Sequence, residues 1–371
     1  MIINKISLNN YRNIENAVIE PDKSVNVIYG DNAQGKTNII EGIFIFSGSK
    51  SFRSNKDSDL IKKDAENKKS ELEVEFSTKY DEKCGKLVIK DNRTCYINGI
   101  ERTAGEMGDT FPVVVFSPKE LNLIEDGPDE RRRFLDVGLY QLKSAYGELM
   151  KSYRQALNQR NAVIRNIRAG YDVEESLDIW DFQLAFIGAK IIYQREKYIE
   201  KIYEYAKKFF SLLSENNEKL EMKIKKTCSV NEIEVGAIND SLYEKLKESR
   251  KKDVETGYTT CGPHRDDIEI TIDGMNAKNF ASQGQKRSAV IAIKMGEAFV
   301  LNDVYGEKPV VLLDDVLSEL DERRQSCILN NIEDFQVFIT CCDVENVSRL
   351  NKGKTFRISK GQITDVSSLG Q

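Results

Sequence analysis

Two halves of one phosphate-binding site lie almost at opposite ends of this chain. The first is Gly30-Asp31-Asn32-Ala33-Gln34-Gly35-Lys36-Thr37, and the second is the apolar run 310–313 followed by Asp314 and Asp315. A P-loop enzyme holds Mg²⁺ between the loop hydroxyl and an aspartate at the end of a neighbouring strand, so the two segments must meet in the fold. Their wide separation therefore predicts a large insertion within one nucleotide-binding head.

The first half matches the phosphate-loop pattern G-x-x-x-x-G-K-[ST] in full. The glycines let backbone N–H groups surround phosphate oxygens, Lys36 reaches the β and γ phosphates, and the Thr37 hydroxyl binds Mg²⁺ at a helix N-terminus. A strand-like run, 25–29, precedes the loop and a helical pattern follows it, which is the context that the motif requires. We therefore predict ATP and Mg²⁺ as cofactors, and we expect nucleotide contacts from the whole loop, from Asn38 and from Arg12.

The second half places two carboxylates at the end of a buried strand. Asp314 stands where a magnesium ligand belongs, and Asp315 is positioned to accept a proton from the attacking water. We expect Lys36, Asp314 and Asp315 to be the catalytic residues, and Thr37 and Asp314 to hold the metal. The alternative interpretation is an exposed acidic turn that follows a core strand.

A third motif, Phe280-Ala281-Ser282-Gln283-Gly284-Gln285-Lys286-Arg287, opens a predicted helix upstream of the acidic strand. A helix N-terminus is a favourable place for an anion, so Ser282, Gly284 and Gln285 are candidate nucleotide contacts. Because serine is also a good N-cap residue, an ordinary helix cap is the alternative. The order of this motif relative to the other two favours the nucleotide role.

The pattern of apolar residues divides the chain into a sheet-rich head and a helical insertion. Strands are predicted over 2–8, 25–29, 72–76, 86–89, 94–97 and 113–116, in a mixed sheet with antiparallel hairpins. From about Arg131 the apolar spacing becomes helical, which predicts one long helix as far as Gly170 and a second from about Trp180 to Leu212. These two helices should pack antiparallel as an arm, and the simplest role of their apolar stripes is the seam between them.

The sheet is expected to resume after the arm. We predict strands over 268–272, 310–313 and 336–340, a helix over 283–304, and a final hairpin of 355–358 and 362–366. The resulting division is a discontinuous head, 1–130 with 257–371, and a helical insertion, 131–256. The fold class is therefore α/β with an inserted α-helical arm.

Composition excludes several classes of protein. No apolar run is long enough to span a membrane and the N-terminus lacks the apolar block of a signal peptide, so we expect a cytoplasmic protein without a membrane partner. The seven cysteines form no C-x-x-C pair, which favours reduced thiols over disulfides or zinc. With His264 as the only histidine, a histidine dyad or a multi-histidine metal site is excluded. The net charge of −5 leaves room for a local basic face.

Taken together, the motifs resemble the ABC-type ATPase head of the SMC and RecF group, and the short insertion points to the RecF family. The phosphate loop, the insertion, the Ser-Gly motif, the Asp-Asp strand and Ser318-Glu319-Leu320-Asp321 carry this resemblance. Four further strings match it: Phe116-Ser117-Pro118-Lys119-Glu120-Leu121, Arg131-Arg132-Arg133-Phe134-Leu135-Asp136, Tyr153-Arg154-Gln155-Ala156-Leu157 and Gly262-Pro263-His264-Arg265-Asp266-Asp267.

The resemblance implies a DNA replication and repair protein that binds ATP and dimerises head to head around two nucleotides. Ser282, Gly284 and Gln285 would contact the γ-phosphate held by the other subunit, and Asp321 would lie in the D-loop across that interface. The implied partners are double-stranded and gapped DNA, a second copy of the chain, and RecR with RecO. The implied location is the cytoplasm, associated with the nucleoid.

The chain departs from general ABC heads at three places. It has Asp315 where those heads carry a catalytic glutamate and Thr340-Cys341 where a switch histidine would follow the next strand, and both changes fit a slow ATPase that acts as a timer. Glu120 or Ser117 lies near the expected Q-loop, but this stretch contains no glutamine.

Basic residues suggest a DNA contact without sequence specificity. Arg131, Arg132 and Arg133 open the predicted arm and could line a cleft with five lysines, Lys56, Lys62, Lys63, Lys68 and Lys69. Charge runs are more often solvated faces. His264 and Arg265 follow a Gly-Pro turn, where a structural role in the core is the alternative to a ligand contact.

Three other functions are compatible with parts of the sequence. A transporter ATP-binding subunit would carry a Q-loop glutamine and a switch histidine and would lack the inserted hairpin. A long-armed SMC protein or its zinc-hook relative would need far longer heptads or a C-x-x-C hook. A nucleotide-dependent DNA scaffold with incidental turnover cannot be separated from the timer by sequence.

Overall fold

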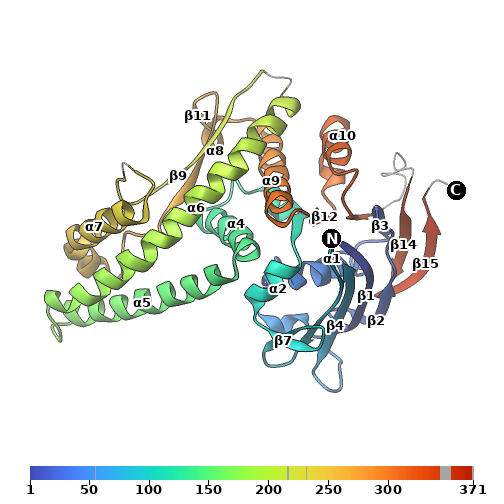
Figure 1. The fold of residues 1–371 in the computed structure, drawn as a ribbon, viewed down its shortest axis with the longest axis horizontal. Helices are drawn as coiled ribbons and strands as arrows, with labels where there is room; N and C mark the ends of the chain where they lie inside the picture. Colours follow the sequence, from blue (N-terminus) through green and yellow to red (C-terminus); the bar gives the residue numbers. More distant parts are fainter. Residues whose placement is uncertain (55, 215–216, 231, 343–351, 370–371) are drawn as a thin grey trace.

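Two six-stranded sheets form the head, and a helical arm extends from one side of it (Figure 1). The computed structural model describes residues 1–54, 56–214, 217–230, 232–342 and 352–369. The first sheet is antiparallel, in the order β2 (Ile14–Ile19), β1 (Ile2–Tyr11), β4 (Ser70–Ser77), β5 (Glu82–Ile89), β6 (Arg93–Ile97) and β7 (Ile100–Arg102). Strand β2 was not predicted, and it turns back from β1 at Arg12.

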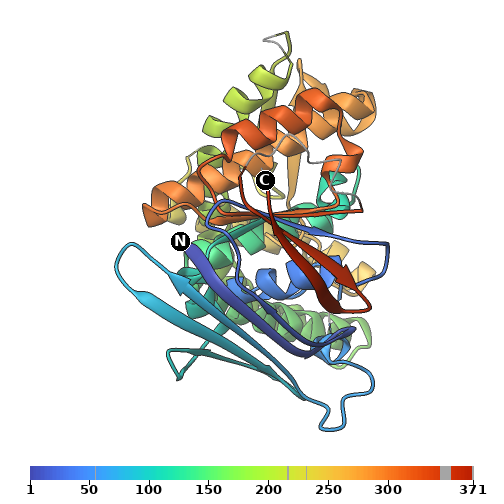
Figure 2. The same cartoon turned by 90° about the vertical axis from the view of Figure 1, so that its right-hand side faces the viewer.

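The second sheet carries the site motifs. Its order is β15 (Gln362–Ser368), β14 (Lys354–Ser359), β3 (Val25–Tyr29), β13 (Val337–Cys341), β12 (Val310–Asp314) and β8 (Val113–Phe116). All its pairs are parallel except the terminal β14–β15 hairpin. The predicted mixed sheet with antiparallel hairpins is thus confirmed, although its strands are divided between two sheets, which Figure 2 shows side-on.

Both faces of the second sheet are buried, as parallel sheets require. Ile28, Val115 and Leu312 face α1 (Lys36–Phe44) and the first sheet, whereas Val27, Val114 and Leu313 face the helices on the other side. The short helices η1 (Ile45–Ser47), η2 (Asp57–Leu60) and α2 (Ala104–Thr110) complete the first layer. Helix α1 therefore lies between the two sheets, with the phosphate loop at its N-terminus.

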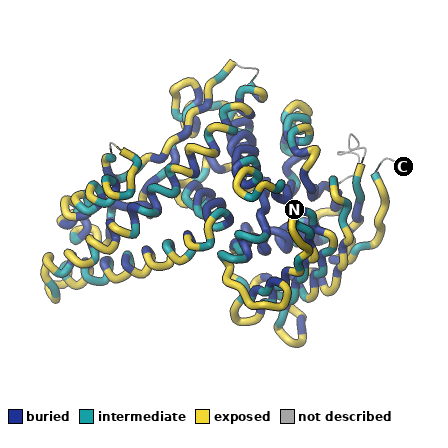
Figure 3. Tube along the Cα trace, viewed as in Figure 1, coloured by how far each residue is buried: buried dark blue, intermediate teal, exposed yellow. Residues whose placement is uncertain are grey.

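Helices cover the other face of the second sheet. They are α3 (Pro118–Leu121), α4 (Pro128–Leu142), α9 (Gln283–Tyr305), η4 (Leu317–Glu319) and α10 (Glu322–Asn331). Helix α9 packs along α6 (Asp178–Leu213) so closely that a Cβ on Gly296 would lie 2.8 Å from the Ile202 carbonyl oxygen. In Figure 3, α9 is buried along most of its length, whereas α6 alternates between buried and exposed residues.

The arm consists of α5 (Ser144–Arg168), η3 (Glu174–Leu177), α6 and α7 (Val235–Thr256). The prediction of one helix from Arg131 to Gly170 was wrong, because Lys143 is extended (φ −152°, ψ 106°) and separates α4 from α5. Leu139 and Tyr146 on either side of this break are both buried in one core, so the apolar spacing runs through it. The second predicted helix corresponds to α6, and α5 packs against it.

A small third sheet joins the arm to the head. It consists of β11 (Met275–Asn276), β10 (Asp267–Ile272) and β9 (Leu220–Lys225), followed by α8 (Ala277–Phe280). The sequence placed 268–272 in the head's sheet, but this strand pairs with β9, which lies in a segment where no strand was expected. The division of the chain at 131 and 257 stays a prediction. None of the described helices combines the length and the apolar character that a membrane span needs.

Buried ion pairs fasten the three arm helices together. Arg160 on α5 is fully buried and donates to Asp181 on α6 and Asp253 on α7, each at 2.6 Å. Arg250 donates to the second Asp181 oxygen at 2.8 Å. A buried charge without its partner is costly, so these residues depend on one another.

Replacing Arg160 with methionine should lower the free energy of unfolding by about 3–5 kcal/mol, because Asp181 and Asp253 would each lose a buried cationic partner. Chemical denaturation followed by circular dichroism would measure this change. The matched control is Lys197→Ala, which removes the exposed pair with Glu200 and should change stability by about 0.5 kcal/mol or less. Equal effects of the two substitutions would contradict the assigned role of Arg160.

His264 is a structural residue between α5 and the loop before β10. Its ring bonds the Tyr153 hydroxyl at 2.8 Å through Nδ1 and the Thr259 carbonyl at 3.2 Å through Nε2. Burial lowers the pKa of His264 to about 4. Burial has the opposite effect on the pKa of nearby Asp266, which it raises to about 6.

Since the unfolded imidazole takes up a proton near pH 6.5 and the folded one only near pH 4, the stability from neutral His264 is complete above pH 6.5 and is lost as the pH falls toward 4. His264→Gln should therefore lose less stability than the unmodified chain over this range, by up to about 3 kcal/mol. Denaturation at pH 7, 5.5 and 4.5 tests this. The variant and the unmodified chain both contain Asp266, so its titration affects them equally. If the free energy of unfolding changes with pH by the same amount in both, the prediction is wrong.

Candidate nucleotide-binding site

The phosphate loop joins β3 to α1 and is held by the C-terminal hairpin. Gly30 has φ 145°, and a Cβ there would lie 2.3 Å from the Ile358 carbonyl oxygen, so only glycine fits. The backbone oxygen of Gln34 accepts from the Gly361 N–H at 2.9 Å, and its side-chain oxygen accepts from the Lys360 N–H at 2.6 Å. The turn of the β14–β15 hairpin therefore supports the loop from outside.

Lys36 is buried inside the loop and faces its carbonyl groups. Its Nζ donates to the Gly30 oxygen at 2.5 Å and to the Asp31 oxygen at 3.0 Å. Asp31, Asn32 and Ala33, at the outer bend, are exposed. The loop thus has the curvature and the central ammonium that a triphosphate requires.

Thr37 and Asp314 meet across the site, as the sequence predicted. The Thr37 hydroxyl donates to Asp314 Oδ1 at 3.0 Å, and the Thr340 hydroxyl donates to the same oxygen at 2.8 Å. Burial raises the pKa of Asp314, while the hydrogen bonds from Thr340 and Thr37 oppose that rise. A hydroxyl and a carboxylate side by side at a phosphate loop fit the protein ligands of Mg²⁺.

Asp315 follows in a left-handed conformation, with φ 55°. Its N–H donates to the Thr340 hydroxyl at 2.9 Å, and its carboxylate accepts from Ser318 Oγ at 3.3 Å. The side chain is only partly buried. This geometry leaves a carboxylate beside the metal ligands, and its catalytic role stays a prediction.

Arg12 and Asn38 border the loop on the side of the first sheet. The Arg12 guanidinium donates to both Glu41 oxygens, at 2.9 and 2.6 Å, and the hydrogen bond to Glu41 raises the pKa of Arg12. Asn38 accepts from the guanidinium of Arg53 at 2.7 Å. Arg53 was not predicted at the site, because it lies in an irregular segment without a motif. It is an exposed cation whose charge partly offsets the rise in the pKa of Asp314.

The Ser-Gly motif forms a second, separate group at the N-terminus of α9. Ser282 and Gln285 form a capping box, which confirms the ordinary helix-cap reading without excluding a nucleotide contact, and Gln285 Nε2 donates to Glu218 at 2.6 Å. Arg324 of α10 donates to the Gly284 oxygen and to Ser288 Oγ, each at 2.9 Å. It also pairs with Asp321, the N-cap residue of α10.

The candidate residues thus form two groups, and the side chains of each group form hydrogen bonds with residues of the same group or its immediate surroundings. One contains the phosphate loop, Asp314 and Asp315, and the other contains the Ser-Gly motif and Asp321. Ser282 is exposed although its hydroxyl caps the helix. The backbone N–H groups at the start of α9 can therefore face an anion from outside the chain.

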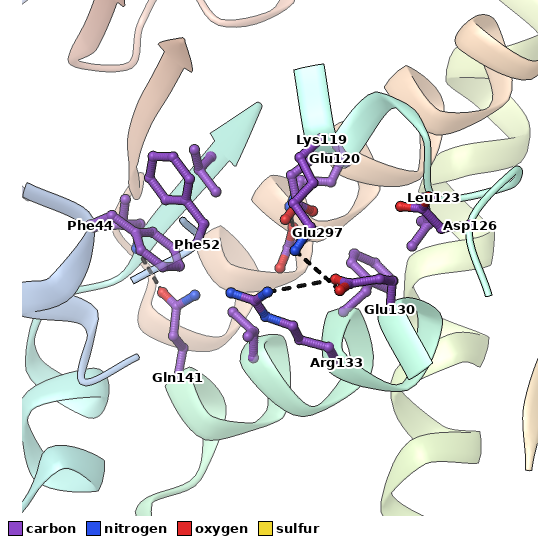
Figure 4. A pocket seen from close by; sticks show the side chains of 15 residues that line it. Phe44, Phe52, Lys119, Glu120, Leu123, Asp126, Glu130, Arg133, Gln141 and Glu297 are labelled. Atoms are coloured by element: carbon purple, nitrogen blue, oxygen red, sulfur yellow. Dashed lines mark hydrogen bonds and ion pairs between the residues drawn. The ribbon is translucent and has the colours of Figure 1, made fainter. Parts of the chain in front are cut away.

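The two residues near the expected Q-loop have structural contacts. Ser117 caps α3, and Glu120 lies 3.7 Å from Lys294, a buried lysine that also pairs with Glu297. Figure 4 shows Glu120 and Glu297 beside a cavity of about 20 Å³. That volume suits a single water molecule and not a nucleotide.

A larger hollow of about 1080 Å³ lies between the head and the arm. Arg132 and Arg133 of the predicted basic cluster line it, but none of the five lysines predicted with them does. Arg131 was wrongly expected in this cleft, since it is buried and bonds both Asp267 oxygens at 2.6 and 2.9 Å. Further cations line the hollow: Lys50, Arg93, Arg102, Arg154 and Arg195. Of these, only Arg154 lies in a string that carried the resemblance.

Comparisons with known proteins agree with this architecture over almost the whole chain. The family described as RecF/RecN/SMC N terminal domain matches residues 2–364. The DNA replication and repair protein RecF of Clostridium perfringens strain SM101 is 39% identical over 367 residues, 98% of this chain and 99% of the relative. That of Clostridium acetobutylicum is 38% identical over 370 residues, 98% of this chain and 100% of the relative.

Solved structures show the same similarity. A structure described as the recombination mediator protein RecF-ATP in the RecFOR pathway is 36% identical, has a TM-score of 0.89 and covers 99% of this chain and 97% of its own. The corresponding RecF-ATPrS structure has a TM-score of 0.90, the same identity, and 97% coverage of each chain. An SMC head bound to the winged-helix domain of ScpA shares 17% identity at a TM-score of 0.55, which is similarity of fold alone.

Proposed function

The chain belongs to the RecF family of ABC-type ATPase heads, and we propose that it is an ATP-dependent DNA-binding protein of recombinational repair and replication-fork maintenance. In this proposal ATP joins two copies head to head, the dimer holds duplex DNA at single-strand gaps, and slow hydrolysis releases it. RecR, with RecO, is the proposed partner in loading a recombinase. Membership of this family argues against the transporter subunit.

The observation that carries the proposal is the division of the site into two groups. The loop group supplies Lys36, Thr37 and Asp314 for the triphosphate and its metal. The Ser-Gly group presents an exposed helix N-terminus but makes its hydrogen bonds with α10 and Glu218. A second copy placing its Ser282, Gly284 and Gln285 against the γ-phosphate would complete each site, with Asp321 beside them.

Each part of the loop group would have its own role in binding and hydrolysing ATP. Backbone N–H groups from Gly30 to Asn38 would bind the phosphates, and Lys36 would leave its carbonyl partners for the β and γ oxygens. Mg²⁺ held by Thr37 and Asp314 would neutralise charge on those oxygens. Asp315 would accept a proton from the attacking water, and Arg12 and Arg53 would add positive charge at the edge of the site.

Duplex DNA would lie along the basic hollow. Arg102, Arg132 and Arg154 come from β7, α4 and α5, so they lie on both the head and the arm. Guanidinium groups on two sides of a hollow suit phosphate contacts, which fix position without reading sequence. Acidic residues such as Glu101 and Asp129 share the lining, so the proposed contact is local.

The mass of the protein in solution tests the shared-nucleotide dimer. At a dilute protein concentration, the unmodified chain should dimerise and retain gapped duplex DNA with ATP and Mg²⁺, and should be monomeric with ADP or without nucleotide. Lys36→Met should remain monomeric because it cannot hold the triphosphate, and Ser282→Arg because it blocks the approach of the second copy.

Multi-angle light scattering with each nucleotide, with and without DNA, gives this comparison. Ser152→Arg, which adds the same side chain to an exposed position of α5, is the matched control and should dimerise normally. If mass and DNA retention do not respond to nucleotide, a scaffold independent of nucleotide replaces the proposal.

Asp315→Asn tests hydrolysis as a timer. Loss of the proton acceptor should slow ATP hydrolysis about 100-fold or more and lengthen the lifetime of the ATP dimer in proportion. Phosphate release and the decay of light scattering after dilution measure the two rates. The control Asp365→Asn removes an exposed carboxylate on β15 and should alter neither. If Asp315→Asn hydrolyses ATP at the rate of the unmodified chain and the dimer lifetime is unchanged, the timer hypothesis is wrong.

A further inference from the structure

One ridge of α6 exposes aromatic side chains near the far end of the arm. Phe182 and Phe186 are 59% and 49% exposed, and their rings stack at 6.4 Å with an interplanar angle of 8°. Ile179, 60% exposed, lies beside them. The contacts within the arm are made by the opposite side of the helix, where Asp181, Leu184 and Gly188 are buried.

Charged residues stand at the two ends of this aromatic pair. Asp178, with a side chain 60% exposed, lies one turn before Phe182, and Lys190 lies one turn after Phe186 with its Nζ 3.9 Å from that ring. We call Asp178, Phe182, Phe186 and Lys190 the arm ridge. Its residues are spaced four apart, so they form one row on the helix surface.

The arm ridge is complementary to itself. A two-fold axis midway between Phe182 and Phe186 would place a second ridge antiparallel to the first. Each Asp178 would then face the Lys190 of the other copy, and each Phe182 would face a Phe186. Rows spaced four apart interlock in the commonest class of helix packing, and a two-fold contact requires such a self-complementary patch.

We propose that the arm ridge binds the arm ridge of a second copy of this chain about this axis. Two cations of α7 lie near the Asp178 end: Arg250, which binds Asp178 at 2.5 Å, and Lys247. The exposed Glu174 and Glu175 at the arm tip offset these cations, so this end still matches the partner's Lys190 end. One helical ridge is smaller than a standard interface, so the association is weak and needs high protein concentration.

This contact does not rest on the nucleotide dimer, and the experiment separates the two. Sedimentation velocity without nucleotide, over a range of protein concentrations, should show a monomer–dimer equilibrium. Phe182→Ser with Phe186→Ser should abolish it. Asp178→Lys alone and Lys190→Asp alone should each weaken it about tenfold, because like charges then face each other, and the double swap should restore it.

Thermal unfolding of each variant confirms that it folds, which matters for Asp178 because of its bond to Arg250. Lys197→Asp, on an exposed position of α6 outside the arm ridge, is the matched charge control and should leave the equilibrium unchanged. Rescue by the double swap supports the two-fold pairing. A monomeric unmodified chain, or association that ignores the ridge variants, overturns the proposal and leaves the ridge to a different protein partner.

Discussion

The contact between Thr37 and Asp314 is the constraint on which the rest of the structure depends. It joins residues 277 positions apart in the chain, at a distance of 3.0 Å. Strand pairing makes it possible: β13 lies between β3 and β12, and its Thr340 stands directly beside Asp314 in the parallel register. The segments that form the arm and the third sheet are inserted between strands of this sheet, and they must fold without disturbing that register.

The Ser-Gly group is organised by one side chain. Arg324 bonds the Gly284 carbonyl, the Ser288 hydroxyl and the Asp321 carboxylate, so it connects the start of α9 to the start of α10. Both helices begin with a side-chain cap, from Ser282 and from Asp321. The two helix starts are thereby fixed relative to each other, so a contact made by the Ser-Gly group would need less further ordering.

Local patterns in the sequence were sufficient for the parts of the structure that depend on local chemistry. Strands β3, β8 and β12, helices α6 and α9 and the phosphate loop all follow from periodicity, glycine positions and helix capping. The break at Lys143 could not be predicted, because the helical spacing of apolar residues continues from α4 into α5. The apolar residues of both helices are buried in the same core. The β9–β10 pair was missed because register between distant segments leaves no local signal.

The candidate site shows the same limit, residue by residue. The pattern predicted that Thr37 and Asp314 would meet because both stand at fixed places in a known geometry. Arg53 and Arg324 have no motif of their own, and only the folded chain shows them bonded to Asn38 and to Gly284. For Arg131 the sequence had a signal that was misleading. It belongs to a basic run and was predicted to line a DNA cleft, but tertiary packing buries it against Asp267.

Helix α9 connects the Ser-Gly group mechanically to the arm. It begins at the cap formed by Ser282 and passes α6 at Gly296, where the two backbones are too close for a side chain between them. Buried Lys294 and Glu297 on α9 pair with each other, and Lys294 also reaches Glu120 before the arm begins. Arg160 in turn holds α5 and α7 to α6. A continuous set of close-packed helices therefore runs from the Ser-Gly group to the arm, and such interiors have low compressibility.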